Sequence, residues 1–377
     1  MERRTFKDGS QVSLLGYGTM RFPLRGSRAA DIDEAEAARQ IDYAYENGVN
    51  YFDTAWMYHD YTSEAFVGKV LSRYPRNSFN LATKMPPWEL ESERDLARIF
   101  DEQLRRCKVD YFDYYLLHCV SRSTLPMFEN VGAYEFCREQ QKKGKLRHLG
   151  FSIHDSAELL TYMLDKWEFD FVQIQLNYLD WDQLDSRGLY ETARGRDIPI
   201  IVMEPIRGGT LATLCPESVA ILQAAAPERS IASWAMRYAA LPGVLCVLSG
   251  MSSMEQVKDN IATYQKAVPL TPGEREALAR AVETYRAKAT VPCTACRYCI
   301  PCPVGVDIPQ SFGAYNLYKG SGNKRGFCME YEFIGEGNQP DSCTQCGACL
   351  ERCPQQLDIP KLLDEIAKTY VGLAGYS

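Results

Sequence analysis

Short hydrophobic runs alternate along most of the chain with stretches in which apolar residues recur at helical spacing. Eight of the runs are almost continuously hydrophobic: residues 13–18, 49–55, 79–85, 112–118, 148–153, 171–177, 198–205 and 243–250. Continuous runs of this length are typical of parallel strands covered on both faces, because strands with one face in water alternate apolar and polar residues. The pattern therefore predicts eight parallel strands.

The stretches between the runs predict helices. Residues 33–48 begin with acidic residues and end at Gly48, as capped helices do, and residues 92–107 and 253–266 behave alike. Strands alternating with helices over some 285 residues predict a (β/α)8 TIM barrel, whose usual size is roughly 250 residues with insertions. A doubly wound open sheet is the alternative, although no G-x-G-x-x-G follows the first run.

A second region follows a predicted helix at residues 271–292. The sequence CPVGVDIP at 302–309 is matched by CPQQLDIP at 353–360, and each copy follows a run of cysteines. This repeat predicts two similar halves joined by a linking segment, whose Gly- and Asn-rich parts are expected to be loops. We therefore predict two domains, residues 1–290 and residues 291–377, the second one small and helical.

The cysteines of this second region have the spacing of iron–sulfur ligands. Cys343, Cys346, Cys349 and Cys353 follow C-x2-C-x2-C-x3-C-P, the spacing of bacterial ferredoxins. In two-cluster ferredoxins the fourth cysteine of each run binds the other cluster. The upstream run is one residue short in its last interval and consists of Cys293, Cys296, Cys299 and Cys302.

We therefore expect two [4Fe–4S] clusters in a ferredoxin-type tail. The expected ligands are Cys293, Cys296, Cys299 and Cys353 for the first cluster, and Cys343, Cys346, Cys349 and Cys302 for the second. One cluster with idle thiols is an alternative, and zinc is another, because four thiolates at C-x2-C spacing also bind zinc. The other six of the fourteen cysteines are scattered, and we expect them to be small buried hydrophobic residues.

Composition removes several classes of function. Net charge is −7 with no block of Lys or Arg, so the basic surface typical of nucleic-acid binding is absent. The longest apolar runs, such as IPIIVM, are far too short to cross a bilayer, and no apolar segment follows the basic N-terminal residues. We expect a cytoplasmic protein, where clustered cysteines favour metal binding over disulfides.

Polar residues at the ends of three predicted strands, together with one tyrosine, suggest a proton-transfer site. Asp53, Lys84 and His118 each end an apolar run, and Tyr58 follows Asp53. Catalytic groups of such barrels lie at the C-terminal ends of the strands. The pKa of a free tyrosine is about 10, and we expect the Lys84 ammonium to lower it. Asp53 would hold the lysine charged, and His118 would orient a carbonyl oxygen.

At this point the chain resembles the aldo-keto reductase family over roughly residues 10–265. The resemblance rests on the segments GYGTM, YFDTAWMYHDYTSEAFVG, ATK and YYLLH, with Glu64 and Gly68 also in register. It implies a catalytic tetrad of Asp53, Tyr58, Lys84 and His118. Tyr58 would act as general acid in reduction and as base in oxidation. Hydride would come from a nicotinamide cofactor bound across the mouth of the barrel.

The same resemblance implies the cofactor contacts. They are Gly18, Thr19, Asp53, Ser152, Gln173, Met203, Glu204, Ile206, Gly208, Ser249, Met251, Ser253, Gln256 and Asn260. Arg207 would assist the pyrophosphate, whereas Ile153 stands where the family has an Asn. Gly250 and Gln256 replace the Lys and Arg with which many members hold the 2′-phosphate of NADPH. This loss argues against a strong NADPH preference and makes NADH possible, with Lys258 as a weak substitute.

The residues that would line a substrate pocket are less specific. Trp56, Trp88 and Trp181 fall in predicted loops, where they would wall the pocket for an apolar or aromatic carbonyl or serve as plain packing. His59 and His154 are candidates for the pocket lining, and His148 is expected to be structural.

The resemblance implies an NAD(P)-dependent oxidoreductase that interconverts a small-molecule carbonyl and an alcohol. A nicotinamide moves hydride, whereas a cluster moves single electrons, and no flavin motif that would link them is found. The clusters are therefore expected to be structural, to sense redox state, or to exchange electrons with a protein partner. Two other functions remain open: an electron-transfer oxidoreductase fed by the clusters, and a non-catalytic redox-sensing subunit.

Overall fold

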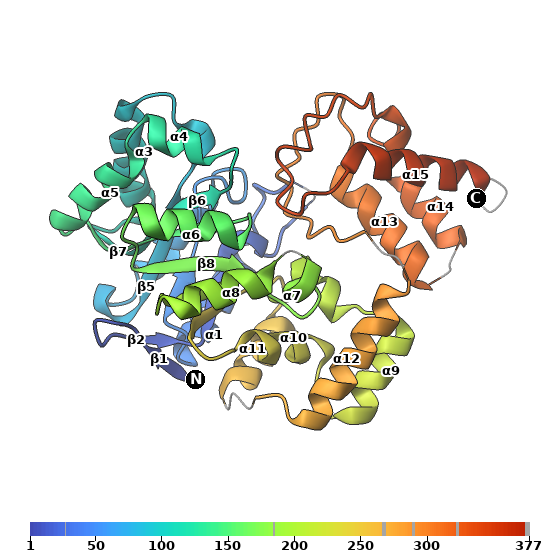
Figure 1. Ribbon diagram of the computed structural model, residues 1–377, viewed down its shortest axis with the longest axis horizontal. Helices are drawn as coiled ribbons and strands as arrows, with labels where there is room; N and C mark the ends of the chain where they lie inside the picture. The colour runs from blue at the N-terminus through green and yellow to red at the C-terminus, as the bar shows by residue number, and fades with distance from the viewer. Residues whose placement is uncertain (27, 184, 266–268, 289–290, 322–323, 374–377) are drawn as a thin grey trace. The chain divides into compact units, whose positions relative to one another are not determined.

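The computed structural model of the protein describes residues 1–26, 28–183, 185–265, 269–288, 291–321 and 324–373 (Figure 1). The chain forms two compact units. The barrel unit comprises Met1–Pro205 and Ala235–Pro269, and the C-terminal unit comprises Ile206–Trp234 and Leu270–Ser377. The predicted domain boundary after residue 290 separates the residues of the proposed barrel chemistry from the cysteine runs, and it stays a prediction.

Eight parallel strands of the described residues close into a barrel in the order β10-β3-β4-β5-β6-β7-β8-β9. Their bounds are Leu15–Gly18 (β3), Tyr51–Asp53 (β4), Asn80–Met85 (β5), Phe112–Val120 (β6), Leu146–Ile153 (β7), Phe171–Gln175 (β8), Ile200–Met203 (β9) and Val244–Gly250 (β10). Each falls largely within one of the eight hydrophobic runs. The predicted barrel is confirmed, and the doubly wound open sheet is wrong.

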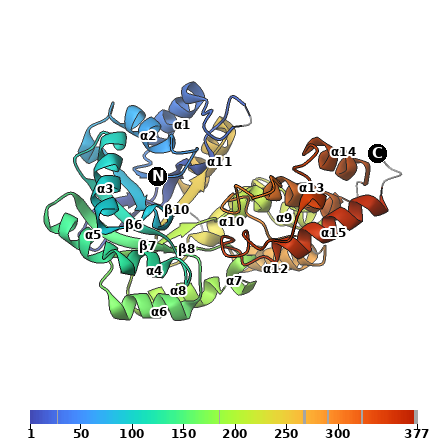
Figure 2. The same ribbon diagram turned by 90° about the horizontal axis from the view of Figure 1, so that it is seen from above.

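Helices surround the strands of the barrel unit, as Figure 2 shows for α1, α2, α3, α5 and α6. Their bounds are Glu34–Glu46 (α1), Ser63–Leu71 (α2), Glu93–Cys107 (α3), Leu125–Asn130 (α4), Ala133–Lys142 (α5), Ala157–Lys166 (α6), Asp180–Gln183 (α7), Ser186–Gly195 (α8), Ile231–Ala239 (α10, shared by the two units) and Met254–Gln265 (α11). The predicted starts at residues 33 and 92 are confirmed, since Asp33 caps α1 and Ser92 forms a capping box at α3.

An N-terminal hairpin precedes the barrel and was not expected from the hydrophobic pattern. Strands β1 (Arg3–Thr5) and β2 (Gln11–Ser13) pair antiparallel, and Gly9 in the turn has φ of +87°. Asp-Gly between two strands is a strong hairpin signal that would have revealed it. Phe6 packs with Tyr51 and Tyr114 in a buried cluster. The His148 ring packs against Phe6 in a tilted arrangement, with ring centres 4.4 Å apart, consistent with its expected structural role.

Helices make up most of the C-terminal unit. They are Pro216–Ala225 (α9), Pro272–Arg286 (α12), Ile308–Ser321 (α13), Lys324–Phe333 (α14) and Ile359–Gly372 (α15), with short 3-10 turns Arg207–Ala212 (η4) and Pro340–Ser342 (η5). Predicted loop residues 320–321 are helical instead, residues 335–339 form a turn as expected, and residues 322–323 lie outside the described residues.

The internal repeat is visible in how two of these helices begin. Each DIP sequence leads into a helix, α13 in the first copy and α15 in the second. Asp307 accepts a hydrogen bond from the Gln310 amide at 3.1 Å, and Asp358 accepts one from the Lys361 amide at 3.4 Å. Apolar residues of both helices share one buried core with Cys299. The two halves therefore use the same local structure.

Candidate active site

The tetrad predicted from the sequence comes together at one end of the barrel. Strand pairing places Asp53 of β4 beside Ala82, two residues before Lys84 in β5. The fully buried Lys84 Nζ donates to Asp53 Oδ1 at 2.6 Å and to the Thr54 carbonyl oxygen at 2.7 Å. The Tyr58 hydroxyl oxygen lies 3.5 Å from Lys84 Nζ. The ammonium therefore lies between a carboxylate and a phenol.

His118 completes the arrangement from β6. Its imidazole ring lies 6.1 Å from the Tyr58 ring and 5.5 Å from the Trp88 ring. Burial lowers the pKa of His118 well below its usual value, and the charges of Lys84 and His154 lower it further. The imidazole is therefore neutral near physiological pH, so it can donate one hydrogen bond without bringing a second positive charge.

The protonation of Tyr58 differs from the sequence-based expectation. Its pKa is raised well above 10, chiefly by burial and then by the negative charges of Asp53 and Glu204. The Tyr58 side chain is half-buried. The expectation that Lys84 lowers this pKa is wrong here. The reason is that burial of the phenol, together with the negative charges of Asp53 and Glu204, outweighs the stabilisation of a phenolate by the ammonium.

Burial also shifts the two charged members of the site. It lowers the pKa of Lys84, while Asp53 and then Glu64 oppose that change. It raises the pKa of Asp53, which the Lys84 charge and hydrogen bond oppose. Each partner therefore keeps its charge because the other is present. The backbone carbonyl oxygen of Thr54, a residue that the hydrophobic pattern did not single out, is the second acceptor of the ammonium.

The residues expected to hold the nicotinamide amide lie on neighbouring strands. Ser152 of β7 pairs with Gln173 of β8, and the Ser152 hydroxyl oxygen accepts from the Cys119 amide at 2.8 Å. Gln173 Nε2 donates to the sulfur of Met203 at 3.5 Å. The side-chain oxygen of Gln173, Oε1, is buried without a hydrogen-bond partner among the described residues. A carboxamide N–H would satisfy this acceptor, so the residues fit a nicotinamide.

Two predicted contacts lie at the end of β3. Gly18 pairs with Asp53 on one side and with Gly250 on the other. The Thr19 hydroxyl is 2.9 Å from the Ser63 hydroxyl, which holds the chain after β3 against α2. Both β3 and β10 therefore end in a glycine, beside Asp53 at the end of β4.

The predicted adenosine-binding residues form a polar cluster between β10 and α11. Ser249 Oγ accepts from Asn260 Nδ2 at 3.0 Å, and Met251 is buried. Gln256 Oε1 accepts from the Ser252 amide at 2.7 Å, and the Gln256 amide donates to Ser253 Oγ at 3.4 Å. Gln256 therefore caps the start of α11.

The remaining cofactor candidates follow β9. Glu204 has φ of +54° and pairs with Arg21 at 3.9 Å. Ile206, Arg207 and Gly208 lie in the C-terminal unit, at the start of η4, where Gly208 has φ of +64°. Lys258, the weak substitute for the missing cations, lies 5.8 Å from the centre of the Tyr43 ring.

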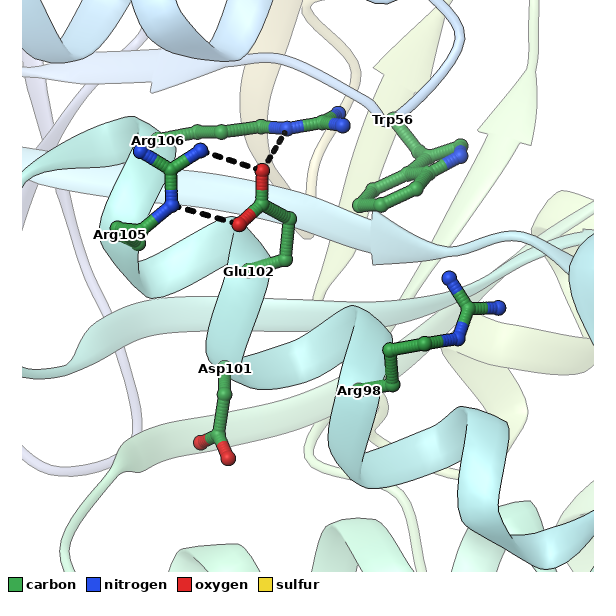
Figure 3. Close-up of a pocket in the computed structure, with 6 residues that line it drawn as sticks. All are labelled: Trp56, Arg98, Asp101, Glu102, Arg105 and Arg106. Carbon is green, nitrogen blue, oxygen red and sulfur yellow. Dashed lines mark hydrogen bonds and ion pairs between the residues drawn. The ribbon is translucent and has the colours of Figure 1, made fainter.

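The three tryptophans have different surroundings. Trp88 is 38% exposed and its ring lies beside that of His118, as expected for a wall of a substrate pocket. Trp56 is buried beneath the guanidinium of Arg106, at 3.9 Å, and borders a surface pocket lined by charged residues of α3 (Figure 3). Trp181 packs against Tyr190 and Tyr238.

The two other histidine candidates also differ. His59 Nε2 accepts from the Phe22 amide at 3.2 Å, and Nδ1 lies 2.8 Å from the Ala29 carbonyl oxygen. His59 therefore holds the segment between these residues. Burial lowers the pKa of His154 to about 4, and His154 interacts electrostatically with His118, so it lies near the tetrad.

The two cysteine runs fold alike. The Ala295 amide donates to Cys293 Sγ at 3.3 Å, and the Gln345 amide donates to Cys343 Sγ at 3.4 Å. Positive φ angles occur at the same places in both runs: Ala295 and Arg297 in the first, Gln345 and Gly347 in the second. Amide-to-sulfur hydrogen bonds of this kind tune iron–sulfur clusters. The run with the shorter last interval therefore keeps the loop conformation of the complete motif.

The thiols approach one another across the two runs. The pKa of Cys299 is raised by burial, and also by the neighbouring thiolates of Cys296, Cys293 and Cys353. The pKa of Cys349 is likewise raised by burial and by Cys343, Cys302 and Cys346. Each group contains the last cysteine of the opposite run. Among the described residues, no three Cys, His, Asp or Glu side chains are grouped closely enough to hold a single metal ion.

Comparison with known proteins agrees with this geometry. The family model "Aldo/keto reductase family" matches residues 14–283, and the model "4Fe-4S dicluster domain" matches residues 292–357. L-galactose dehydrogenase of Arabidopsis thaliana is 27% identical over 278 residues, which cover 67% of this chain and 85% of that protein. An NADH-specific methylglyoxal reductase of Escherichia coli (strain K12) is 26% identical over 218 residues, covering 53% and 65%.

A solved structure shows the same barrel. The aldo-keto reductase AKR11C1 from Bacillus halodurans, in its holo form, superposes with a TM-score of 0.61 at 27% identity, covering 74% of this chain and 96% of that one. The fold and the family match thus define an NAD(P)-dependent oxidoreductase of the (β/α)8 barrel class. The chain belongs to the aldo/keto reductase family, and it carries a 4Fe-4S dicluster domain in its tail. The dicluster match favours two iron–sulfur clusters over zinc or a single cluster.

No helix within the described ranges has the length and hydrophobicity to span a membrane.

Proposed function

We propose that this protein interconverts a carbonyl compound and an alcohol by hydride transfer with a nicotinamide cofactor. The observation that carries the proposal is the contact of the buried Lys84 ammonium with Asp53 on one side and Tyr58 on the other. A proton donor must lie within hydrogen-bond reach of the reacting oxygen and hold its proton at working pH. Tyr58 meets the second condition because its raised pKa keeps the phenol protonated.

Each member of the tetrad has a role in the proposed reaction. Bound nicotinamide supplies or accepts the hydride, and Gln173 and Ser152 would hold its carboxamide. Tyr58 Oη gives its proton to the carbonyl oxygen of the substrate, while the neutral His118 donates a hydrogen bond to that oxygen and fixes its direction. Lys84 stabilises the phenolate left behind, and Asp53 keeps Lys84 charged. The protonated phenol favours reduction of the carbonyl.

The substrate pocket and the tail extend the proposal. Trp88 beside His118 favours an apolar or aromatic carbonyl compound. In the tail, Cys293, Cys296, Cys299 and Cys353 would bind one cluster, and Cys343, Cys346, Cys349 and Cys302 the other. We place the domain boundary after residue 290, and the protein in the cytoplasm, where thiolate ligands stay reduced. Exchange of electrons with a protein partner remains a second candidate function of the tail, beside a structural or sensing role.

The experiment that tests the proposed function is a titration of the anaerobically purified protein. Iron and sulfide are counted, NADH and NADPH are added, and a panel of small aldehydes and ketones follows. Oxidation of the nicotinamide that depends on the carbonyl compound is expected. Reduction of the clusters by NAD(P)H with no carbonyl turnover would instead support the electron-transfer function.

The same titration tests the choice of nicotinamide. Because Gly250 and Gln256 bring no cation to the expected 2′-phosphate position, we expect NADH to bind at least as tightly as NADPH. A Gln256→Arg variant is expected to improve kcat/KM for NADPH by about tenfold, since a guanidinium pairs with phosphate. Lys258→Gln removes the weak substitute cation, which lies by the Tyr43 ring, and is expected to change either value by less than about twofold. A wild-type preference for NADPH of more than tenfold would contradict the assignment.

A further inference from the structure

A buried carboxylate outside the tetrad contacts the residues that surround Lys84. Glu64 of α2 has no exposed side-chain surface. Its Oε1 atom accepts from Thr83 Oγ1 at 2.7 Å and from Gln103 Nε2 at 2.8 Å, and Arg106 Nη1 lies 3.4 Å from Oε2. Burial raises the pKa of Glu64, but all three contacts oppose this rise. Since every contact is a donor, the ionised carboxylate fits the site.

These contacts hold the backbone of Lys84 on both sides. Thr83 precedes Lys84 in β5, and Gln103 Nε2 donates to the Lys84 carbonyl oxygen at 2.9 Å as well as to Glu64. The side-chain oxygen of Gln103, Oε1, accepts from the Tyr115 hydroxyl at 2.6 Å, which fixes the orientation of the side-chain amide. Glu64 thus joins α2, α3 and β5 directly behind the catalytic ammonium.

Glu64 also acts on Lys84 through its charge. Burial lowers the pKa of Lys84, and Glu64 is the second carboxylate, after Asp53, that opposes this. The titratable and charged groups around the two side chains come from every element packed against them: Asp53 and Tyr58 beside β4, Arg106 and Cys107 on α3, and Tyr115 and His118 on β6. Only Arg106 among these carries a positive charge that offsets Glu64.

We infer that Glu64 is a positioning residue that fixes the end of β5 and helps to keep the Lys84 ammonium charged. The inference rests on the proposed function, because it takes Lys84 as a member of the proton-transfer set. Glu64 touches neither substrate nor cofactor in this scheme. Its effect should therefore appear in the pH dependence of the reaction more than in its rate near neutral pH.

The variant Glu64→Gln separates charge from shape. Glutamine keeps an oxygen for Thr83 and Gln103 and loses the negative charge. Without that charge the buried ammonium releases its proton more easily, so activity is lost at a lower pH as the pH rises. We expect the alkaline limb of the kcat/KM profile to move to lower pH, with a loss that grows from under threefold near neutrality to about tenfold in the alkaline limb.

The matched control is Glu102→Gln. Glu102 is the other carboxylate partner of Arg106, at 2.9 Å, and Figure 3 draws this pair; among the described residues its carboxylate accepts from Arg105 and Arg106, not from the side chains of Thr83 or Gln103. The pH profile of this variant is expected to match the wild type. If Glu64→Gln does not fold, Arg106→Met makes the test from the other side. Loss of the cation that offsets Glu64 leaves its negative charge more effective at Lys84, so the alkaline limb should move to higher pH, opposite to its shift in Glu64→Gln.

A measurement independent of turnover separates this inference from the proposed function. In protein labelled with 13C at the lysine Cε, the resonance missing from Lys84→Met reports the charge of Lys84. We expect it to titrate at lower pH in Glu64→Gln than in Glu102→Gln. Identical titrations and identical alkaline limbs in the two variants would overturn the inference. A wild type without carbonyl turnover would overturn the proposed function alone, because the resonance still reports on Glu64.

Discussion

Replacing Tyr58 by Phe is expected to reduce kcat for carbonyl reduction by about a thousandfold. The phenol is the proposed proton donor to the substrate oxygen: its pKa is raised well above 10, so it is protonated near neutral pH, whereas that of His118 is lowered. Removing a positioned general acid typically costs about 10²–10⁴ in rate. Phenylalanine keeps the ring beside Lys84, so the fold and the binding of nicotinamide should remain. Steady-state kinetics with a small aldehyde measure the effect.

A neighbouring tyrosine supplies the control for this prediction. Tyr61 lies three residues further along and is 48% exposed, and its hydroxyl donates to Glu89 at 3.2 Å. Tyr61→Phe should therefore retain wild-type kinetics within about twofold, as substitutions at exposed positions usually do. If Tyr58→Phe retained activity as well, the assignment of the general acid would be wrong.

If the last cysteine of each run binds the cluster of the other run, cysteine variants should lose iron in a specific pattern. The wild type should contain about eight iron atoms per chain, and Cys353→Ala or Cys302→Ala about four. Adding Cys299→Ala to Cys353→Ala should leave four, because both residues serve the first cluster. Adding Cys299→Ala to Cys302→Ala should leave almost none, because the two residues then serve different clusters. Iron and sulfide analysis of anaerobic preparations gives these counts.

The double variants make the pairing falsifiable. If each run bound its own cluster, the two double variants would exchange their iron contents. Cys328→Ala is the control, since Cys328 is buried in α14 and belongs to neither run, and it should keep all the iron. Loss of iron in that variant would point to unfolding of the tail.

The barrel and the tetrad were predictable from the sequence because both depend on local pattern. A strand covered on both faces is hydrophobic along its whole length, so all eight barrel strands could be recognised as continuous hydrophobic runs. The C-terminal ends of the parallel strands lie on one rim of the barrel, so the closeness of Asp53, Lys84 and His118 could be predicted from the sequence. The hairpin at Gly9 was missed because its strands are short and its signal lies in the turn.

Features that depend on the balance of several neighbours were not predictable. The sequence places a lysine beside Tyr58, but the sign of the pKa shift depends on burial and on how Asp53 offsets that lysine. Glu64 shares a motif with the tetrad, yet its contacts with Thr83 and Gln103 form only when α2 and α3 pack behind β5. Residues 320–321 contradicted a loop prediction because they continue α13, and extending a formed helix costs less than starting one, even at a glycine.

The most direct test of the account follows the hydride itself. The protein is supplied with NADH carrying deuterium at the reactive C4 position, an aldehyde is added under anaerobic conditions, and the alcohol is analysed by mass spectrometry and NMR. The account predicts one deuterium on the former carbonyl carbon, at a rate that Tyr58→Phe lowers about a thousandfold. Alcohol without deuterium, formed while the clusters cycle between oxidation states, would show that electrons reach the substrate singly and would contradict hydride transfer at the tetrad.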